Sequence, residues 1–266
     1  MEYTLNPVAT QETLDILVKE YIEDRSQEEH LTDYIYCLTK TWDNKHDPLP
    51  PTEQTLMLWV TGLGLERVLI EGRRAPKIEY DGILMSPDFD FSFGPGELKT
   101  TRQSSKRGLA GDYPLTWHQQ FMGYLKGRLE TGIMEYDGRG RATMTLTVLY
   151  LMGNYSPPFP QLLSWDLSYN REEIETNWLA LSTRRGWYKK YEEQDKRPDA
   201  FHWNQDWECG EGQNKCVYWM RCAAASASSR QEQRSQNQDA GSGIPRPQGV
   251  DTPPFTLIEG GTHSTD

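Results

Sequence analysis

The run ATMTLTVLYLM, residues 142–152, places the tightest constraint on the fold of this chain. It is rich in β-branched and aliphatic residues, which favour a central strand of a sheet. Such a strand needs neighbours in the same sheet. Strand-like segments occur at residues 77–85, 88–93, 97–101 and 161–169, and helix-like segments at 52–70, 114–130 and 170–194. This order predicts one α/β or α+β domain with a central mixed sheet flanked by helices.

Two of the predicted helices have distinctive sequences. The helix at 170–194 opens with Asn170 and Glu173, which have the spacing of a capping box. The helix at 52–70 is apolar on most faces, so we expect it to be buried, with Glu66 and Arg67 as polar exceptions near its end.

Length and composition set the domain organisation. The chain has 266 residues, of which 36% are hydrophobic, enough for one well-buried domain. From about residue 223 the sequence consists mainly of small and polar residues with scattered prolines. We therefore expect residues 1–222 to form a single domain and residues 223–266 a disordered tail. The first thirty residues lack the apolar core of a signal peptide, and no apolar run approaches the length of a membrane span. We therefore expect a cytoplasmic protein with no membrane partner, in which disulfides are disfavoured.

The charge balance bears on possible nucleic-acid partners. The net charge of −11 and a sequence pI near 5.0 argue against such a partner, which normally needs a basic field. A local basic stripe can still act inside an acidic protein, although each cluster alone is more typical of a solvated charged face. Two such clusters are present, one with Lys99, Arg102, Lys106 and Arg107 and the other with Arg184, Arg185, Lys189 and Lys190.

The stretch SPDFDFSFGPGELKTTR, residues 86–102, gathers acidic residues around one basic residue. With Gly-Pro-Gly as a turn, the two flanking strands would lie side by side. Residues two apart in a strand share a face, so Glu97 and Lys99 project together and can meet an aspartate from the preceding strand. Carboxylates in this arrangement suit Mg²⁺ or Mn²⁺, and a neighbouring lysine suits phosphodiester hydrolysis. The alternative is a charged edge-strand ion pair.

A Glu-x-Lys match alone is weak, because about one chance match is expected in a chain of this length. It is followed, however, by a predicted helix in which Gln120 and Tyr124 lie four residues apart on one face. Together these motifs resemble the RecB-like branch of the PD-(D/E)XK nuclease superfamily over residues 35–222. The resemblance implies a restriction-endonuclease-like core.

The resemblance also implies roles for individual residues. Its catalytic set would comprise Asp88, Glu97, Lys99, Gln120 and Tyr124. Its metal ligands, for Mg²⁺ or Mn²⁺, would be Glu66, Asp88, Glu97 and Leu98. The family usually has a His or Glu on an earlier helix, and Glu66 supplies that position. Asp81 and Asp90 remain rivals to Asp88, because the sequence does not fix the register of the strands.

The four cysteines form a second pattern, with Cys37 far upstream and Cys209, Cys216 and Cys222 spaced as C-x6-C-x5-C. Compact zinc ribbons use paired C-x2-C knuckles, which this chain lacks. The arrangement resembles the iron–sulfur subset of RecB-like nucleases, which includes CRISPR-associated exonucleases and the AddB nuclease domain. The resemblance implies a structural [4Fe–4S] cluster that clips the two ends of the domain together. The longer C-x6-C gap departs from the family, so structural Zn²⁺ is the alternative.

These features predict a metal-dependent deoxyribonuclease whose partner is DNA, single-stranded or with a free end. An exonuclease is favoured over an endonuclease. The basic clusters would follow the phosphate backbone, and Trp117 and Trp187 are candidates for stacking on bases, with core packing as the default for both. Two alternatives stay open: a non-catalytic nucleic-acid-binding or assembly module that keeps the nuclease fold, and a zinc-stabilised interaction domain.

Overall fold

The computed structural model describes residues 8, 12, 15, 16, 28–70, 72–92, 94–199, 206–209 and 216–226. By contacts the chain divides into two compact units, residues 1–225 and 226–266, and the elements below belong to the first. Residues 219–225 are helical, so regular structure continues past the predicted start of the tail at residue 223. The remainder of that tail, from residue 227, lies outside the described residues.

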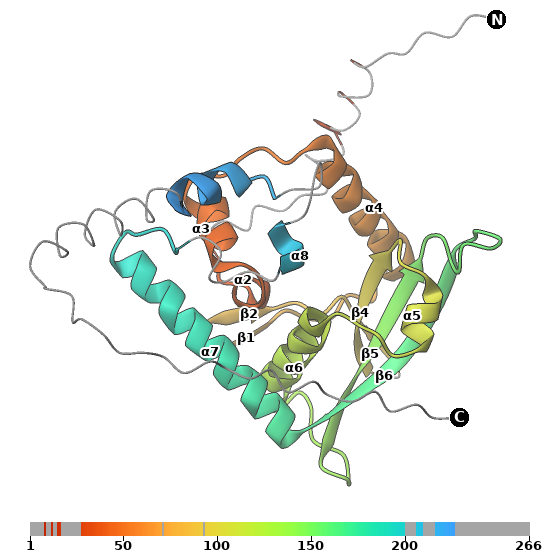
Figure 1. The fold of residues 1–266 in the computed structure, drawn as a ribbon. Helices are drawn as coiled ribbons and strands as arrows, with labels where there is room; N and C mark the ends of the chain where they lie inside the picture. Colours follow the sequence, from red (N-terminus) through yellow and green to blue (C-terminus); the bar gives the residue numbers. More distant parts are fainter. Residues whose placement is uncertain are drawn as a thin grey trace, which may run out of the picture. The chain divides into compact units, whose positions relative to one another are not determined.

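The first unit is α+β, with helices packed around two sheets (Figure 1). The helices are α2 (Leu31–Ile35), α3 (Leu38–His46), α4 (Glu53–Ile70), α5 (Ser105–Leu109), α6 (Leu115–Glu130), α7 (Arg171–Glu193) and α8 (Asp206–Cys209). The strands are β1 (Ile78–Tyr80), β2 (Ile83–Met85), β3 (Phe89–Phe91), β4 (Gly94–Thr101), β5 (Arg141–Tyr150) and β6 (Gln161–Asn170). The predicted fold class and mixed sheet are confirmed.

The larger sheet has the strand order β3-β4-β5-β6. Its central pair, β4 and β5, is parallel, whereas β3 and β6 are antiparallel to their neighbours. A parallel pair needs a long crossover, and here the crossover contains α5 and α6. The predicted central strand is β5, with Leu146 and Val148 fully buried. This connection places α6 between α7 and the strands (Figure 1), where it can present side chains towards β4.

The Gly-Pro-Gly sequence is not a turn, contrary to the prediction. Gly94, Pro95 and Gly96 belong to β4 and pair with Phe91, Asp90 and Phe89 of β3. A Cβ atom on Gly96 would lie 2.2 Å from the Phe89 ring and 2.5 Å from the backbone oxygen of Thr145, so the glycine permits close packing of three strands.

The prediction that the helix at 52–70 is buried is wrong. Among the α4 side chains that the structure describes, Leu56 and Ile70 alone are buried, while Leu58 and Val68 are 50% and 78% exposed. The helix contacts β4 along one side, where Gly62 lies beside Thr100, and its other described apolar side chains are half-buried or exposed. No helix in the described part of the chain is long and apolar enough to cross a membrane.

Candidate functional site

The side chains of Glu97, Lys99 and Gln120 form a closed set of hydrogen bonds. Lys99 Nζ donates to Glu97 Oε1 at 2.7 Å and to Gln120 Oε1 at 2.9 Å. Gln120 Nε2 also donates to Glu97 Oε1, at 2.9 Å. Glu97 and Lys99 share a face of β4, and α6 places Gln120 over that face. The crossover helix therefore positions the amide that holds the lysine against the carboxylate.

Tyr124 extends this set along α6. It lies one helical turn after Gln120 and accepts a hydrogen bond from Gln120 Nε2 at 2.7 Å. Its hydroxyl donates to the backbone oxygen of Ser86, 3.3 Å away, two residues before Asp88. Tyr124 thus ties α6 to the loop that precedes β3. The part played by Ser86 could not be predicted, because a backbone acceptor leaves no mark in residue type or spacing.

Asp88 lies on the open side of β4. The backbone N–H of Leu98 donates to Asp88 Oδ2 at 2.8 Å. Because β3 pairs with β4 only at Gly94–Gly96, no β3 backbone group pairs with Leu98, and Asp88 takes that place beside the strand. The N–H and C=O of one residue point to the same side of a strand, so the Leu98 carbonyl oxygen also faces the Asp88 side.

The two rival aspartates lie elsewhere. Asp90 accepts a hydrogen bond at 2.7 Å from the buried Arg128, on the last turn of α6. Asp81 occupies the turn between β1 and β2 and pairs with Arg185 at 3.3 Å. Only Asp88 of the three is hydrogen-bonded to the Glu97–Lys99 segment in the described structure.

Negative charge exceeds positive charge at this site. Burial, followed by the charges of Glu97 and Glu66, holds the pKa of Asp88 well above its ordinary value, although Lys99 opposes the shift. Burial disfavours the Lys99 ammonium, but the Glu97 and Asp88 carboxylates outweigh it and raise the pKa of Lys99. Lys99 is therefore a cation at neutral pH, but its charge does not bring the pKa of Asp88 down to the ordinary value.

Glu66 reaches the site from α4, through its charge on Asp88. Its carboxylate also pairs with Arg74 at 2.8 Å, and its side chain is only 18% exposed. The structure thus brings together the side chains that were predicted to act around the metal or the substrate. They come from α4, from the segment of β3 and β4, and from α6: Glu66, Asp88, Glu97, Lys99, Gln120 and Tyr124.

One atom stands out in this set: Glu97 Oε2 is buried and accepts no hydrogen bond within the structure. A buried carboxylate oxygen without a partner is costly, unless a cation or a water molecule meets it. Its donor type suits a hard divalent cation. Across the described residues, however, no three His, Cys, Asp or Glu side chains converge closely enough to form a ready-made metal site.

The four cysteines line one pocket, together with Lys40, Glu208, Tyr218 and Trp219. All four are half-buried, and none forms a disulfide with another described cysteine. Cys37 precedes α3, and its backbone N–H donates to Glu208 Oε1 of α8 at 2.9 Å. Burial raises the pKa of the Cys37 thiol, with Glu208 adding to the effect. Thiols drawn from both ends of the described chain fit the donor chemistry of an iron–sulfur cluster or of zinc.

An arginine that the sequence patterns did not indicate adjoins this pocket. Arg197 Nη2 lies 3.3 Å from Cys222 Sγ and donates to it. The same guanidinium holds the buried Asp43 of α3 through two hydrogen bonds, of 2.7 Å and 2.6 Å. No spacing rule links residues 43, 197 and 222, so the contact could be found only from the fold.

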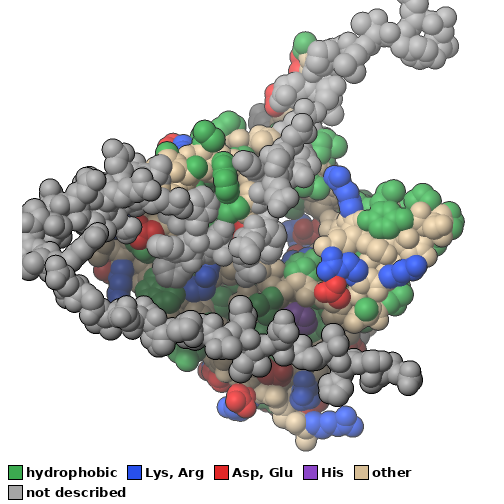
Figure 2. Space-filling view, in the orientation of Figure 1, with side chains coloured by type: hydrophobic (Ala, Val, Ile, Leu, Met, Phe, Trp, Pro, Cys, Tyr) green, Lys and Arg blue, Asp and Glu red, His purple; other side chains and the backbone are tan. Residues whose placement is uncertain are grey.

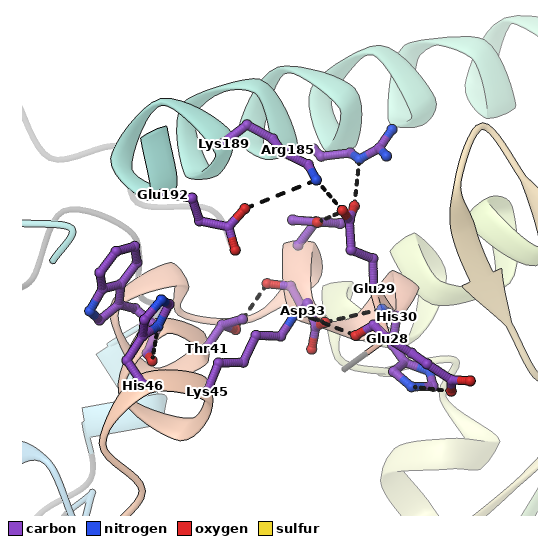
Figure 3. Close-up of polar contacts among 12 residues, drawn as sticks. Glu28, Glu29, His30, Asp33, Thr41, Lys45, His46, Arg185, Lys189 and Glu192 are labelled. Carbon is purple, nitrogen blue, oxygen red and sulfur yellow. Dashed lines mark hydrogen bonds and ion pairs between the residues drawn. The ribbon is translucent and has the colours of Figure 1, made fainter. Parts of the chain in front are cut away.

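The second basic cluster is occupied within the protein (Figure 3). Glu29 accepts hydrogen bonds from Arg185 Nε at 2.9 Å, from Tyr34 at 2.7 Å and from Lys189. Arg184 donates to the backbone oxygens of Tyr34 and Tyr36, each at 2.6 Å. Three of the four predicted phosphate contacts are therefore engaged in joining α7 to the segment around α2.

The chain matches no protein-family model, and no curated protein matches it. Among solved structures it is similar to the crystal structure of SSO0001, with 14% sequence identity and a TM-score of 0.41, over 68% of this chain and 87% of that chain. At this level the similarity says nothing about what the present chain does.

Proposed function

We propose that this chain is a metal-dependent deoxyribonuclease of the PD-(D/E)XK superfamily, RecB-like branch, built on a restriction-endonuclease-like core. The observation that carries the proposal is the buried, unpartnered Oε2 of Glu97, held beside Asp88 by the hydrogen bonds to Lys99 and Gln120. A buried oxygen without a hydrogen bond, next to an aspartate with a raised pKa, favours a bound cation at this place over a salt bridge that serves structure alone.

The roles of the residues follow from their contacts. Asp88, Glu97, the Leu98 carbonyl and Glu66 would hold Mg²⁺ or Mn²⁺, directly or through water. When bound, the metal activates water and offsets charge on the phosphoryl group. Lys99 remains protonated, so it acts as a cation that stabilises developing negative charge rather than as a base. Gln120 fixes the direction of that ammonium, and Tyr124 fixes Gln120.

The test is a cleavage assay on labelled single- and double-stranded DNA, with Mg²⁺, Mn²⁺ or chelator. Wild type is expected to cut with metal only, and Glu97→Gln is expected to be inactive. Asp81→Asn is the matched control: it removes an aspartate that pairs with Arg185 away from the site. Absence of cleavage by wild type with either metal, or equal cleavage by Glu97→Gln, refutes the proposal.

We also propose that Cys37, Cys209, Cys216 and Cys222 hold a [4Fe–4S] cluster whose role is structural. The support is their shared pocket, reached from α3, α8 and the helix at 219–225. Anaerobically purified protein should show visible absorption with about four iron atoms per chain, and Cys222→Ser should lose both. A colourless protein with stoichiometric zinc contradicts the cluster and assigns the pocket to Zn²⁺.

A further inference from the structure

An exposed aromatic and basic surface adjoins the end of the strand that contains Lys99. The chain leaves β4 at Thr101 and continues through Arg102 into α5. Arg102 is three residues after Lys99, which is about 10 Å along the strand direction. The loop that joins β5 to β6 lies against this segment. Figure 2 shows hydrophobic side chains next to Lys and Arg side chains over the region that Figure 1 labels α5, β5 and β6.

Backbone contacts hold the two segments together. Leu151 N–H donates to Thr101 O, and Ser105 N–H donates to Gly153 O, both at 2.9 Å. The Tyr155 hydroxyl donates to the backbone oxygen of Arg102. Gly108 packs so tightly on Tyr150 that a Cβ there would lie 1.8 Å from its hydroxyl oxygen. The segment after β4 and the β5–β6 loop therefore form one ordered surface.

Two aromatic side chains project from this surface. Tyr155 and Phe159 are 48% and 45% exposed, although residues of this kind are usually buried. Tyr155 is also held at φ 70°, a left-handed conformation that a tyrosine rarely adopts. The loop therefore keeps an aromatic ring outward at a conformational cost. Trp187, which the sequence suggested for stacking, is 41% exposed but lies on α7.

The cations beside these rings are of two kinds. Arg107 is compensated, because Asp112 accepts from its guanidinium at 2.7 Å. Arg102 and Lys106 are exposed and form no ion pair with the described residues. In a chain with a net charge of −11, two uncompensated cations beside two exposed rings indicate a partner that is both anionic and aromatic.

We infer that this surface, defined by Arg102, Lys106, Tyr155 and Phe159, binds single-stranded DNA and leads it to the site at Lys99. Bases stack on the two rings, and phosphates pair with the two cations. Paired bases in a duplex have no free face to offer these rings, so the surface selects single strands. The inference rests on the proposed nuclease function only in its second part, that the bound DNA is led to the site at Lys99. Binding of DNA to the surface needs no metal.

The test is fluorescence anisotropy of a labelled oligonucleotide across a salt series, in the Glu97→Gln background so that nothing is cut. The double variant Tyr155→Ala/Phe159→Ala is expected to bind single-stranded DNA at least about tenfold more weakly. Its salt dependence should be unchanged. Tyr155→Phe keeps the ring and removes only the hydroxyl that donates to Arg102, so it should bind like the parent and separates stacking from the loss of that hydrogen bond.

The cationic pair has a different expected effect. Arg102→Gln/Lys106→Gln should reduce the slope of log K against log salt by about 1.4, or about 0.7 for each phosphate of a single strand that the variant no longer neutralises. Arg107→Gln is the matched control for the cationic pair, since Asp112 compensates the Arg107 charge. Leu162→Ala is the control for the aromatic variant, since Leu162 is an apolar side chain on β6 that is 52% exposed. Both should bind like the parent.

Several results overturn the inference: unchanged binding by the aromatic variant, an equal loss in Leu162→Ala, equal binding of a duplex, or preference for RNA of the same sequence. These outcomes are separate from failure of the proposed function. If wild type cuts DNA in a Glu97-dependent manner while all variants bind normally, only the binding surface is wrong. If wild type cuts nothing while the binding pattern holds, the nuclease proposal is wrong and the surface stands.

Discussion

Two carboxylate clusters in this molecule have similar composition and opposite electrostatics. Glu29 accepts hydrogen bonds from Tyr34, Arg185 and Lys189, and despite the opposing effect of burial these bonds hold its pKa below the ordinary value (Figure 3). Asp88 lies with Glu97, Glu66 and one lysine, and its pKa is raised well above the ordinary value. Each cluster contains acidic and basic groups, with Arg74 paired to Glu66 in the second, but Glu29 accepts hydrogen bonds from two cations whereas Asp88 accepts one from the Leu98 backbone N–H.

The difference separates two kinds of carboxylate. Glu29 stabilises the fold, whereas Asp88 would be stabilised by a bound cation. Glu29 joins α7 to the segment around α2, and its charge has local partners from three residues. Glu97 is buried and Asp88 is half-buried, both feel the charge of the Lys99 ammonium, and Glu97 retains one oxygen without a hydrogen bond among the described residues. Function commonly requires such destabilising arrangements, so the two clusters should respond in opposite ways to neutralisation.

The largest expected effect is on chemistry. Lys99→Ala should lower the single-turnover cleavage rate by about 10²- to 10³-fold, because it removes a preorganised cation and the donor to Glu97 Oε1. Lys77→Ala, at an exposed position just before β1, is the control and should cut at the wild-type rate. A Lys99→Ala rate within a few-fold of wild type would show that the Asp88–Glu97 cluster is not catalytic.

The next effect is on the scaffold beneath the cluster. Gly96→Ala should destabilise the protein by about 1–3 kcal/mol, because the new methyl group meets the Phe89 ring and the Thr145 carbonyl. Gly64→Ala in α4 has open space and should be neutral or stabilising by about 0.5–1 kcal/mol. Chemical denaturation measures both values, and equal stabilities would show that β3 does not depend on this close approach.

The elements of the fold were largely predictable from sequence, and their environment was not. Periodicity and capping located β5 and α7, and Asn170 and Glu173 form the predicted capping box. The exposure of α4 and the pairing of Gly-Pro-Gly within β4 depend on which neighbours pack against them, and local sequence does not encode those neighbours. Contacts such as Arg197 with Cys222, or Tyr124 with Ser86, depend on tertiary distance alone.

The candidate site divides in the same way. Residues linked by strand and helix periodicity, such as Glu97 with Lys99 and Gln120 with Tyr124, could be paired from spacing. The choice between Asp88 and Asp90 could not, because it depends on the register of β3 against β4, and Asp81 is set apart by its place in the turn between β1 and β2. The pairing of Phe89 with Gly96 leaves Asp88 beside Leu98 and turns Asp90 to Arg128.

Neutralising the Glu29 cluster should cost stability. Glu29→Gln is expected to lower the free energy of unfolding at pH 7 by about 1–2 kcal/mol, since it weakens three hydrogen bonds around a partly exposed carboxylate. The folded-state pKa of Glu29 is lowered, so this contribution is present above its unfolded-state value and is lost as pH falls through the folded value. The difference between wild type and Glu29→Gln should therefore shrink on acidification.

The smallest expected effect has the opposite sign. Without metal, Asp88→Asn should stabilise the protein at pH 7 by on the order of 1 kcal/mol, because it removes a buried charge that Glu97 and Glu66 disfavour. Asparagine can still accept the hydrogen bond from Leu98 N–H. Denaturation in the presence of chelator measures this difference, with Asp81→Asn as the exposed control.

The pH dependence of this last difference is the sharpest test of the comparison. The folded-state pKa of Asp88 is raised, so the unfolded chain releases the proton first and the native state is penalised as pH rises. The penalty is absent below the ordinary value of 3.8 and is complete above the raised value. Both differences from wild type should therefore grow as pH rises from acid to neutral. They have opposite signs, because Asp88→Asn becomes more stable than wild type and Glu29→Gln becomes less stable. Mg²⁺ should reverse the first trend and leave the second unchanged, because a cation satisfies Asp88 but has no place among the partners of Glu29.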